Sequence, residues 1–382
     1  MFRTFLTVFS KNRTTNSSVF KKHSTQTILQ KHCLSFFFLL IAFCLFLYPQ
    51  TVFDSLLAGF ELAFCRVIPA VFPMMVLSGM LVESPLAAWA GILLFPCTRA
   101  LGIRDRSAAT VFFLGLLGGF AVLAQGIDLL YRSRRIDRKQ AELLLCAGIN
   151  AGPSFILLSV GHQLFGSIQL GALLLFSVLF GNYLSALLLS VINTGTQSHF
   201  DAAAVPQSLQ EGFPVRGLFT RVMHKSVDSC TVLCGYIAFF CLLCALAHRL
   251  FPFFSGILCM FLEVTNGIRF VSSLHNPLRL LLTVAVLSWS GLSIHLQAKS
   301  LLPQEIFLRR FYQSRLIAIP GSLALYGIGI RLFPQVVPTI AGTDIRGSRF
   351  SWSIVLSFFL MVAAFLYECT PKNTLRSRQN TV

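Results

Sequence analysis

Charged side chains are scarce in this sequence: Asp, Glu, Lys and Arg together make up 12% of its 382 residues. A typical soluble domain has about 25% charged residues. Hydrophobic residues make up 55% of this chain instead, and its mean hydropathy is +0.73. This composition excludes an ordinary soluble globule and predicts a protein whose main solvent is the lipid bilayer.

The sequence also lacks the short motifs that usually accompany catalysis. It has no Gly-x-Ser-x-Gly elbow, no His-Glu-x-x-His pair and no phosphate-cradling Gly-rich loop with its Lys. We therefore expect no catalytic residues, no cofactor and no enzymatic activity.

The 11 cysteines have no zinc-finger spacing, and they lie in or beside apolar segments. Cys230, Cys234, Cys241 and Cys244 share one face of a helix at 3.6 residues per turn, and His248 follows on the same side. Such a set is compatible with a soft-metal site, but no second Cys or His cluster is evident to close it. We expect small side chains that fill a helix contact, with no metal and no disulfide framework.

Apolar runs recur along the whole chain. They cover residues 34–48, 51–82, 86–98, 108–130, 141–192, 227–262, 279–298, 316–333 and 352–368. Because a helix needs roughly 20 apolar residues to cross a bilayer, the longest runs must contain two segments each. We expect an all-α, polytopic integral membrane protein with about eight to ten membrane helices.

The basic residues are distributed as in a membrane protein. The formal charge is +17, but the Lys and Arg residues are not gathered on one domain among stacking aromatics, so we expect no nucleic-acid partner. Most fall in a basic, disordered arm (residues 1–33), between the apolar runs, or in a basic tail (369–382). Basic residues favour the cytoplasmic side. We therefore expect a multi-pass protein of the cell membrane with a cytoplasmic N-terminus.

The most polar stretch between apolar runs, residues 193–226, divides the chain into two membrane halves, 34–192 and 227–368. The end of this linker, 215–227, sets apolar side chains among basic ones. This amphipathic pattern favours a helix along the membrane surface.

Each half contains a similar interrupted segment: residues 118–125 read GGFAVLAQ, and residues 290–297 read SGLSIHLQ. Basic residues bracket the longer segments that contain them, 108–130 and 279–298. If basic flanks mark the cytoplasm, each longer segment is a re-entrant hairpin that begins and ends on the same side. A plain spanning helix with Gly at a helix contact is the alternative.

Several polar residues fall at membrane depth, where ionisable and amide groups usually face a cavity or a partner. Glu263 and Asn266 follow an apolar run, Asn150 interrupts another, and Gln125 and Gln297 end the two matched segments. We predict that these five residues line a solute site. The alternatives are an interfacial position for Glu263 and a structural role for Asn150, which would satisfy backbone groups freed by the nearby proline.

Six motifs occur in one order: IPAVFP (68–73), GGF (118–120), NAGPSF (150–155), CGYIAFF (234–240), LEVTNG (262–267) and SGLSIHLQ (290–297). In this order they resemble the YlbJ family of sporulation integral membrane proteins. The resemblance implies the nucleoside-recognition or Gate module, also found in nucleoside transporters, spore maturation proteins and ferrous iron transporters. It further implies an endospore-forming bacterium, a role in spore formation, two Gate-like halves and the cytoplasmic membrane.

The first interrupted segment departs from the family pattern. It has Ala121 and Leu123 where the family tends to have Pro and Gly, and Gln125 near a usual basic position. Two functions therefore remain open. The protein binds or passes a small polar solute such as a nucleoside, or it is a non-transporting scaffold that binds other sporulation membrane proteins in a spore-assembly complex.

Overall fold

The computed structural model describes residues 32, 35–36, 38–82, 91–192, 217–274, 278–336 and 352–369, and every regular element within them is helical. The all-α prediction is confirmed. The predicted basic arm and basic tail, and the linker up to residue 216, lie almost entirely outside the described residues.

Four helical segments of the described chain are long and apolar enough to cross a bilayer by length and composition: Ile168–Ile192, Leu218–Leu250, Arg279–Leu301 and Arg309–Leu332. A fifth is added when the bent pair Phe38–Leu47 and Pro49–Cys65 counts as one span. By this criterion the described residues contain fewer spans than the eight to ten membrane helices that we predicted. Many apolar runs instead form helices of 8 to 13 residues, which are too short to cross a bilayer alone.

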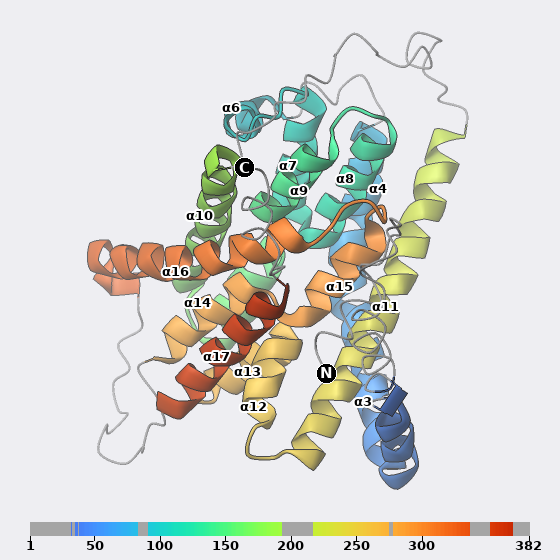
Figure 1. Ribbon diagram of the computed structural model, residues 1–382, viewed down its shortest axis with the longest axis vertical. Coiled ribbons are helices and arrows are strands. Elements are labelled where there is room, and N and C mark those ends of the chain that lie inside the picture. The colour runs from blue at the N-terminus through green and yellow to red at the C-terminus, as the bar shows by residue number, and fades with distance from the viewer. Residues whose placement is uncertain are drawn as a thin grey trace, which may run out of the picture.

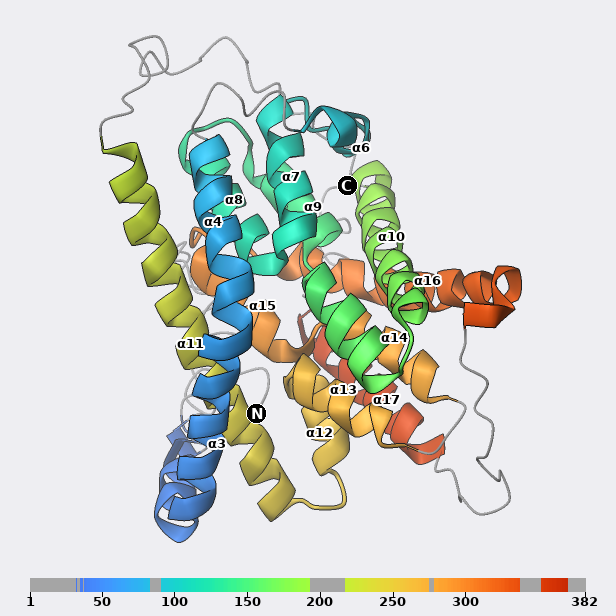
Figure 2. The same cartoon turned by 180° about the vertical axis from the view of Figure 1, so that it is seen from behind.

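The first long helix runs from Pro49 to Val82 and consists of α3 (Pro49–Leu62), the π-helical turn η1 (Ala63–Val67) and α4 (Ile68–Val82) (Figures 1 and 2). Pro69 lacks an N–H, and its ring clashes with the carbonyl four residues earlier in a regular helix. The wider π turn directly before Pro69 accommodates this, so the helix continues.

The segment after the short helices η2 (Ile92–Leu94) and α6 (Phe95–Ala100) forms the first predicted hairpin. Helix α7 (Arg106–Gly118) ends at Gly119, where φ is +83°, and α8 (Phe120–Arg132) runs back along it. The arms are so close that a Cβ on Gly115 would lie 2.7 Å from the Cβ of Leu123. Their outer ends are joined by an ion pair of 2.9 Å between Arg135 Nε and Asp105 Oδ2. The hairpin therefore begins and ends at the same place.

The prediction of a second hairpin at residues 279–298 is wrong. Helix α14 (Arg279–Trp289) packs on α10, α13 and α16, whereas α15 (Gly291–Leu301) packs on α8, α11 and α12. Positive φ angles at Ser290 (+70°) and Gly291 (+73°) interrupt the helix, but the chain continues onward instead of folding back (Figure 1). Basic residues at both ends of this segment are therefore no sign of a return to the same side.

The second half does contain a hairpin, but it lies earlier in the chain. Helices α12 (Ser255–Leu262) and α13 (Val264–Ser272) fold back on one another around Glu263. A Cβ on Gly267 would lie 2.6 Å from the Cα of Met260, and Gly256 lies opposite Phe270. These contacts are symmetric about Glu263, as expected for antiparallel arms.

The two halves consequently share one order of elements: long helix, hairpin, broken helix, long helix. In the first half, α9 (Arg138–Gly148) and η3 (Phe155–Leu164) form the broken helix, and α10 (Ile168–Ile192) is the last long helix. In the second half, α11 (Leu218–Leu250) is the first long helix, α14 and α15 form the broken helix, and α16 (Arg309–Leu332) is the last long helix. Contacts between the halves are reciprocal, since α4 packs on α11, α10 on α16, α8 on α15, and η3 on α13. In this order the matched segments GGFAVLAQ and SGLSIHLQ are not equivalent, because one is a hairpin tip and the other the break of a broken helix.

The remaining elements complete the membrane body. After the short η5 (Pro334–Val336), α17 (Trp352–Cys369) packs on α12 and α16. The predicted surface helix at 215–227 is not a separate element, because α11 begins at Leu218 and continues without a break to Leu250.

Helix α10 shows why this fold suits a bilayer. Its outward side carries large exposed apolar side chains every four residues, Phe176, Phe180, Leu184 and Leu188. Its inward side carries small and polar residues, Ser177, Gly181, Asn182 and Ser185, all of them buried. Apolar side chains outside and polar ones inside are the pattern of a helix that contacts lipid.

Candidate functional site

Each half has two interruptions, a hairpin tip and the break of a broken helix, and the two lie against each other. In the first half, the hairpin tip at Gly119 lies against the break of α9 and η3: the Phe120 N–H donates to the Asn150 carbonyl over 3.2 Å. In the second half, the break at Gly291 lies against the hairpin tip, and a Cβ there would be 2.9 Å from the backbone nitrogen of Val264. Each half therefore brings one hairpin tip and one broken helix together.

Glu263 and Asn266 are in direct contact at the second tip. The Glu263 carboxylate accepts hydrogen bonds from the backbone N–H groups of Thr265 (3.0 Å) and Asn266 (2.8 Å) and from the Asn266 side-chain amide (3.0 Å). It is the N-cap of α13, where a negative charge is stabilised by the helix dipole. Only 7% of Glu263 is exposed. The carboxylate is thus buried among protein groups.

Asn150 lies at the first tip and is completely buried. Its side-chain amide donates to the Gly148 carbonyl at the end of α9 over 3.1 Å, which is the structural role that we weighed. Its Oδ1 atom has no hydrogen-bond partner among the described residues. Asn150 therefore satisfies backbone groups at the break and still presents an unpaired acceptor.

Gln125 and Gln297 lie six residues beyond Gly119 and Gly291, about two helical turns from the breaks. The Gln125 side-chain amide is 3.5 Å from Ser226 Oγ of α11, and its Oε1 atom is buried without a partner among the described residues. The Gln297 amide donates to Ser293 Oγ over 2.6 Å on its own helix. Helices α8 and α15 pack on each other, yet no hydrogen bond joins the five predicted residues into one described site.

Arg315 was not among the residues that the sequence analysis selected, and it is completely buried. Its Nη1 donates to the Ser288 carbonyl of α14 and to Asn182 Oδ1 of α10, each over 2.8 Å, and its Nη2 donates to the Cys146 carbonyl of α9 over 3.1 Å. Asn182 in turn donates to the Ile149 carbonyl over 3.1 Å. One guanidinium and one amide therefore hold the C-terminal ends of α9 and α14, where the two broken helices are interrupted.

This position of Arg315 has a clear electrostatic reason. The C-terminal end of a helix carries a partial negative charge and unpaired carbonyls, which favour a nearby cation. The ring of Phe311 also lies 4.4 Å from the guanidinium carbon, a distance typical of cation–π contact. Arg315 directly precedes the apolar run 316–333, so the sequence pattern grouped it with the basic residues between runs. In the structure it lies inside a 24-residue helix, and the sequence pattern did not indicate this.

An aromatic cluster surrounds His295 next to this break. His295 Nε2 donates to the Trp289 carbonyl over 2.8 Å, and its ring lies 4.9 Å from that of Phe311. The indole N–H of Trp289 donates to the Phe261 carbonyl over 2.9 Å. The C-terminal ends of α12 and α14 are therefore also satisfied by side chains of the second half.

The cysteine face of α11 packs against other helices. Cys230 Sγ is 4.0 Å from Met75 Sδ of α4, and Cys234 packs with Ala63 of η1. At the far end, Cys259 of α12 lies 3.6 Å from His248 Nε2. Among the described residues, no three His, Cys, Asp or Glu side chains are grouped so that they could hold a metal ion.

Comparison with known proteins gives one relative. The chain is 23% identical to the sporulation integral membrane protein YlbJ of Bacillus subtilis (strain 168) over 318 residues, which are 74% of this chain and 78% of the relative. No family model matches the chain, and no solved structure matches it. The matched length is too great for a single shared motif. The chain is a multi-pass integral membrane protein and a distant homologue of the sporulation integral membrane protein YlbJ.

Proposed function

We propose that this protein acts in spore formation and that its interrupted helices bind or pass a small polar solute. The observation that carries the solute proposal is the pair of buried, unpaired oxygens, Gln125 Oε1 and Asn150 Oδ1, among the described residues. A buried polar atom without a partner costs about 1–3 kcal/mol. A bound solute that donates hydrogen bonds would offset this cost.

The two tips have different parts in this proposal. Glu263 and Asn266 already bond to each other and to the start of α13, so they shape the second tip and offer little spare capacity. Asn150 and Gln125 each contribute a buried, unpaired acceptor from the first half. The base of a nucleoside carries at least one N–H donor, and a nucleoside is one example of such a small polar solute.

A gene deletion in the source organism tests this proposal. The deletion strain is compared with the wild type for spore yield and for uptake of labelled nucleosides and other small metabolites. It is then complemented with Gln125→Leu, which removes one unpaired acceptor, or with Gln169→Leu, which changes an exposed glutamine of α10. We expect reduced uptake and spore yield with the first variant only.

The rival function, a scaffold in a spore-assembly complex, is favoured by a different observation. Arg315 and Asn182 fix both broken helices by bonds to buried carbonyls, and this arrangement resists the movement that a transport cycle needs. Loss of spores without any uptake defect would favour the scaffold and contradict the solute proposal.

A further inference from the structure

Two carboxylates lie buried near the base of the first hairpin, Asp128 of α8 and Glu142 of α9. Only 5% of the Asp128 side chain and 6% of the Glu142 side chain are exposed. Neither belongs to the five residues that we predicted to line a solute site. A buried carboxylate needs a partner that compensates its charge, and the partners of these two come from both halves of the chain.

Each carboxylate has one arginine on its own helix. Asp128 Oδ1 bonds Arg132 Nε over 2.6 Å, and Glu142 Oε1 bonds Arg138 Nε over 2.8 Å. The members of each pair are four residues apart, a spacing that places both side chains on one face of a helix. The first half therefore supplies one cation for each of its two buried carboxylates.

Each carboxylate also has one cation from the second half. Asp128 Oδ2 is 2.6 Å from Lys225 Nζ of α11, and Glu142 Oε2 is 3.3 Å from Arg310 Nε of α16. Helices α11 and α16 are the first and the last long helix of the second half. The two carboxylates of the first half therefore hold the second half at both of its long helices.

The loop that joins α15 to α16 adds a further contact with Glu142. The Phe307 N–H donates to Glu142 Oε1 over 3.4 Å, and the Phe307 ring lies 4.2 Å from the guanidinium carbon of Arg138. Lys299 fixes this loop, because its ammonium group donates to three loop carbonyls over 2.6 to 3.2 Å. The second half thus presents a fixed loop to Glu142 as well as a cation.

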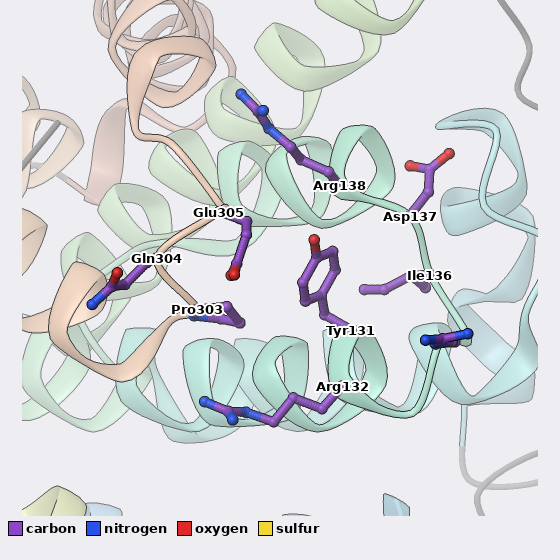
Figure 3. A pocket seen from close by; sticks show the side chains of 9 residues that line it. Tyr131, Arg132, Ile136, Asp137, Arg138, Pro303, Gln304 and Glu305 are labelled. Atoms are coloured by element: carbon purple, nitrogen blue, oxygen red, sulfur yellow. The ribbon is translucent and has the colours of Figure 1, made fainter. Parts of the chain in front are cut away.

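A cavity of about 640 Å³ separates this loop from the turn that joins α8 to α9 (Figure 3). Arg132 and Arg138 lie at opposite edges of the cavity and point away from it (Figure 3). Lys225 and Arg310 do not line it. The turn and the loop therefore have room to move relative to each other, and the ion pairs between the halves hold them in place.

The other end of the broken helix is held differently. Helices α14 and α15 together form one candidate span, so Arg279 and Lys299 lie at its opposite ends. The Arg279 guanidinium carbon lies 5.6 Å from the centre of the Phe165 ring, just after η3. In the part of the chain that the structure describes, no ion pair joins the halves at this end. The charges that join the halves are therefore concentrated at the base of the first hairpin.

We propose that the pairs Asp128–Lys225 and Glu142–Arg310 form a reversible latch that closes the two halves against each other at the base of the first hairpin. Separation of a buried ion pair is normally costly, because it leaves a charge uncompensated. Here each carboxylate keeps the arginine of its own helix when the latch opens. The Lys225 and Arg310 side chains are already 34% and 25% exposed, so water can hydrate them. The halves can therefore part without leaving a lone buried charge.

The latch lies next to one of the predicted solute residues. Gln125 is three residues before Asp128 on α8, and Ser226, whose Oγ is 3.5 Å from the Gln125 amide, directly follows Lys225 on α11. Parting of α8 from α11 would therefore open the contact beside the unpaired Gln125 oxygen. The latch itself needs no solute, so it can be tested on the purified protein.

The rate at which a membrane-impermeant thiol reagent labels a Val122→Cys variant measures the opening. This variant is made in a Cys-free background of the full-length protein and reconstituted into vesicles. Val122 of α8 is completely buried and packs in one cluster with Cys230 and Leu233 of α11, so a cysteine there reports on the contact between the halves. We expect Lys225→Gln and Arg310→Gln each to raise the labelling rate at least fivefold, because each removes only the cation of the second half.

The matched controls change the other cation of the same two carboxylates. Arg132→Gln and Arg138→Gln remove the arginine on the carboxylate's own helix, and we expect them to leave the labelling rate nearly unchanged. Lys225→Arg keeps the charge between the halves and should also be labelled slowly. The melting temperature of every variant separates opening of the latch from a general loss of stability. Because the two ion pairs give the same test twice, a variant that fails to accumulate is replaced by its counterpart in the other pair.

Equal acceleration by the own-helix variants and by the variants of the second half would show that each carboxylate simply needs any two cations. Unchanged labelling in all variants would show that the halves do not part at this place. Either result overturns the proposal. None of these readouts uses spore yield or solute uptake, so the latch proposal and the solute proposal fail or stand separately.

Discussion

Arg315 donates from Nη1 to Asn182 Oδ1 over 2.8 Å, and this bond joins α16, the last long helix of the second half, to α10, the last long helix of the first. The same guanidinium binds the Ser288 and Cys146 carbonyls. A single side chain therefore connects equivalent helices of the two halves with the C-terminal ends of α9 and α14, the first parts of the two broken helices. No carboxylate pairs with Arg315 in the described chain, so helix carbonyls and an amide provide its compensation.

We predict that Arg315→Met destabilises the whole membrane body. The substitution leaves two buried carbonyls and the Asn182 side chain without their donor, and each lost bond to a charged group costs about 1.5–3 kcal/mol. We expect a loss of at least about 3 kcal/mol in the free energy of unfolding. Thermal unfolding of the detergent-solubilised protein, followed by tryptophan fluorescence, measures the effect.

Two further variants make this prediction sharper. Arg315→Lys keeps the charge but replaces the planar fork by a point charge, so we expect an intermediate loss. Arg309→Met removes an exposed arginine from the start of the same helix and should change little. A normal melting temperature for Arg315→Met would show that the broken helices do not depend on this clamp.

We also predict that Glu263 matters more than any other carboxylate. Glu263→Gln keeps an oxygen acceptor for the start of α13 but removes the buried charge, so the protein should still accumulate in the membrane. Under the solute proposal, spore yield should fall sharply. Glu263→Ala removes the cap as well and should further cost about 1 kcal/mol of stability.

Glu61→Gln is the matched control, because Glu61 is exposed on α3 and its charge makes no described bond. Spore counts and membrane levels are measured for all three variants. If Glu263→Gln accumulates normally and supports full spore yield, the carboxylate acts only as a helix cap. The second hairpin tip would then lose its place in the solute proposal.

The cysteine face should hold no metal. We predict that replacing Cys230, Cys234, Cys241 and Cys244 with Ala leaves membrane accumulation and spore yield nearly normal, because each change removes only one small group, worth roughly 1 kcal/mol on the scale of a methylene. Metal analysis of the purified wild-type protein checks the absence directly. Stoichiometric metal in the wild type that disappears in the variant would contradict this, and Cys259 with His248 would then be the additional ligands.

The sequence predicts the helical class and the first hairpin because both depend on local signals, apolar length and the Gly118–Gly119 break. It misplaces the second hairpin for a physical reason. Arms of 8 and 9 residues look like one short apolar run, and the turn residue Glu263 has an extended backbone that needs no glycine. The role of Arg315 is not local either, since its partners Asn182, Ser288 and Cys146 are 133, 27 and 169 residues away.

Topology gives the last prediction. Single cysteines at positions 104 and 134, in a Cys-free background, should be labelled by a membrane-impermeant reagent from the same side, because the Arg135–Asp105 ion pair holds the base of the first hairpin together. Cysteines at 254 and 273 should likewise share a side, since α12 and α13 are the arms of the second hairpin. Labelling of 104 and 134 from opposite sides would refute the first hairpin.

We expect the opposite labelling result for the broken helix formed by α14 and α15. Cysteines at 279 and 300 should be labelled from opposite sides, because α14 and α15 together form one 23-residue candidate span that continues through its interruption. Such a length, at 1.5 Å per residue, is about 35 Å when the two parts are nearly in line, which is enough for the roughly 30 Å hydrocarbon layer. Labelling of both positions from one side would restore the re-entrant hairpin that the basic flanks predicted. The order of hairpin and broken helix in the second half would then have to be reversed, and the reciprocal contacts between the halves would lose their explanation.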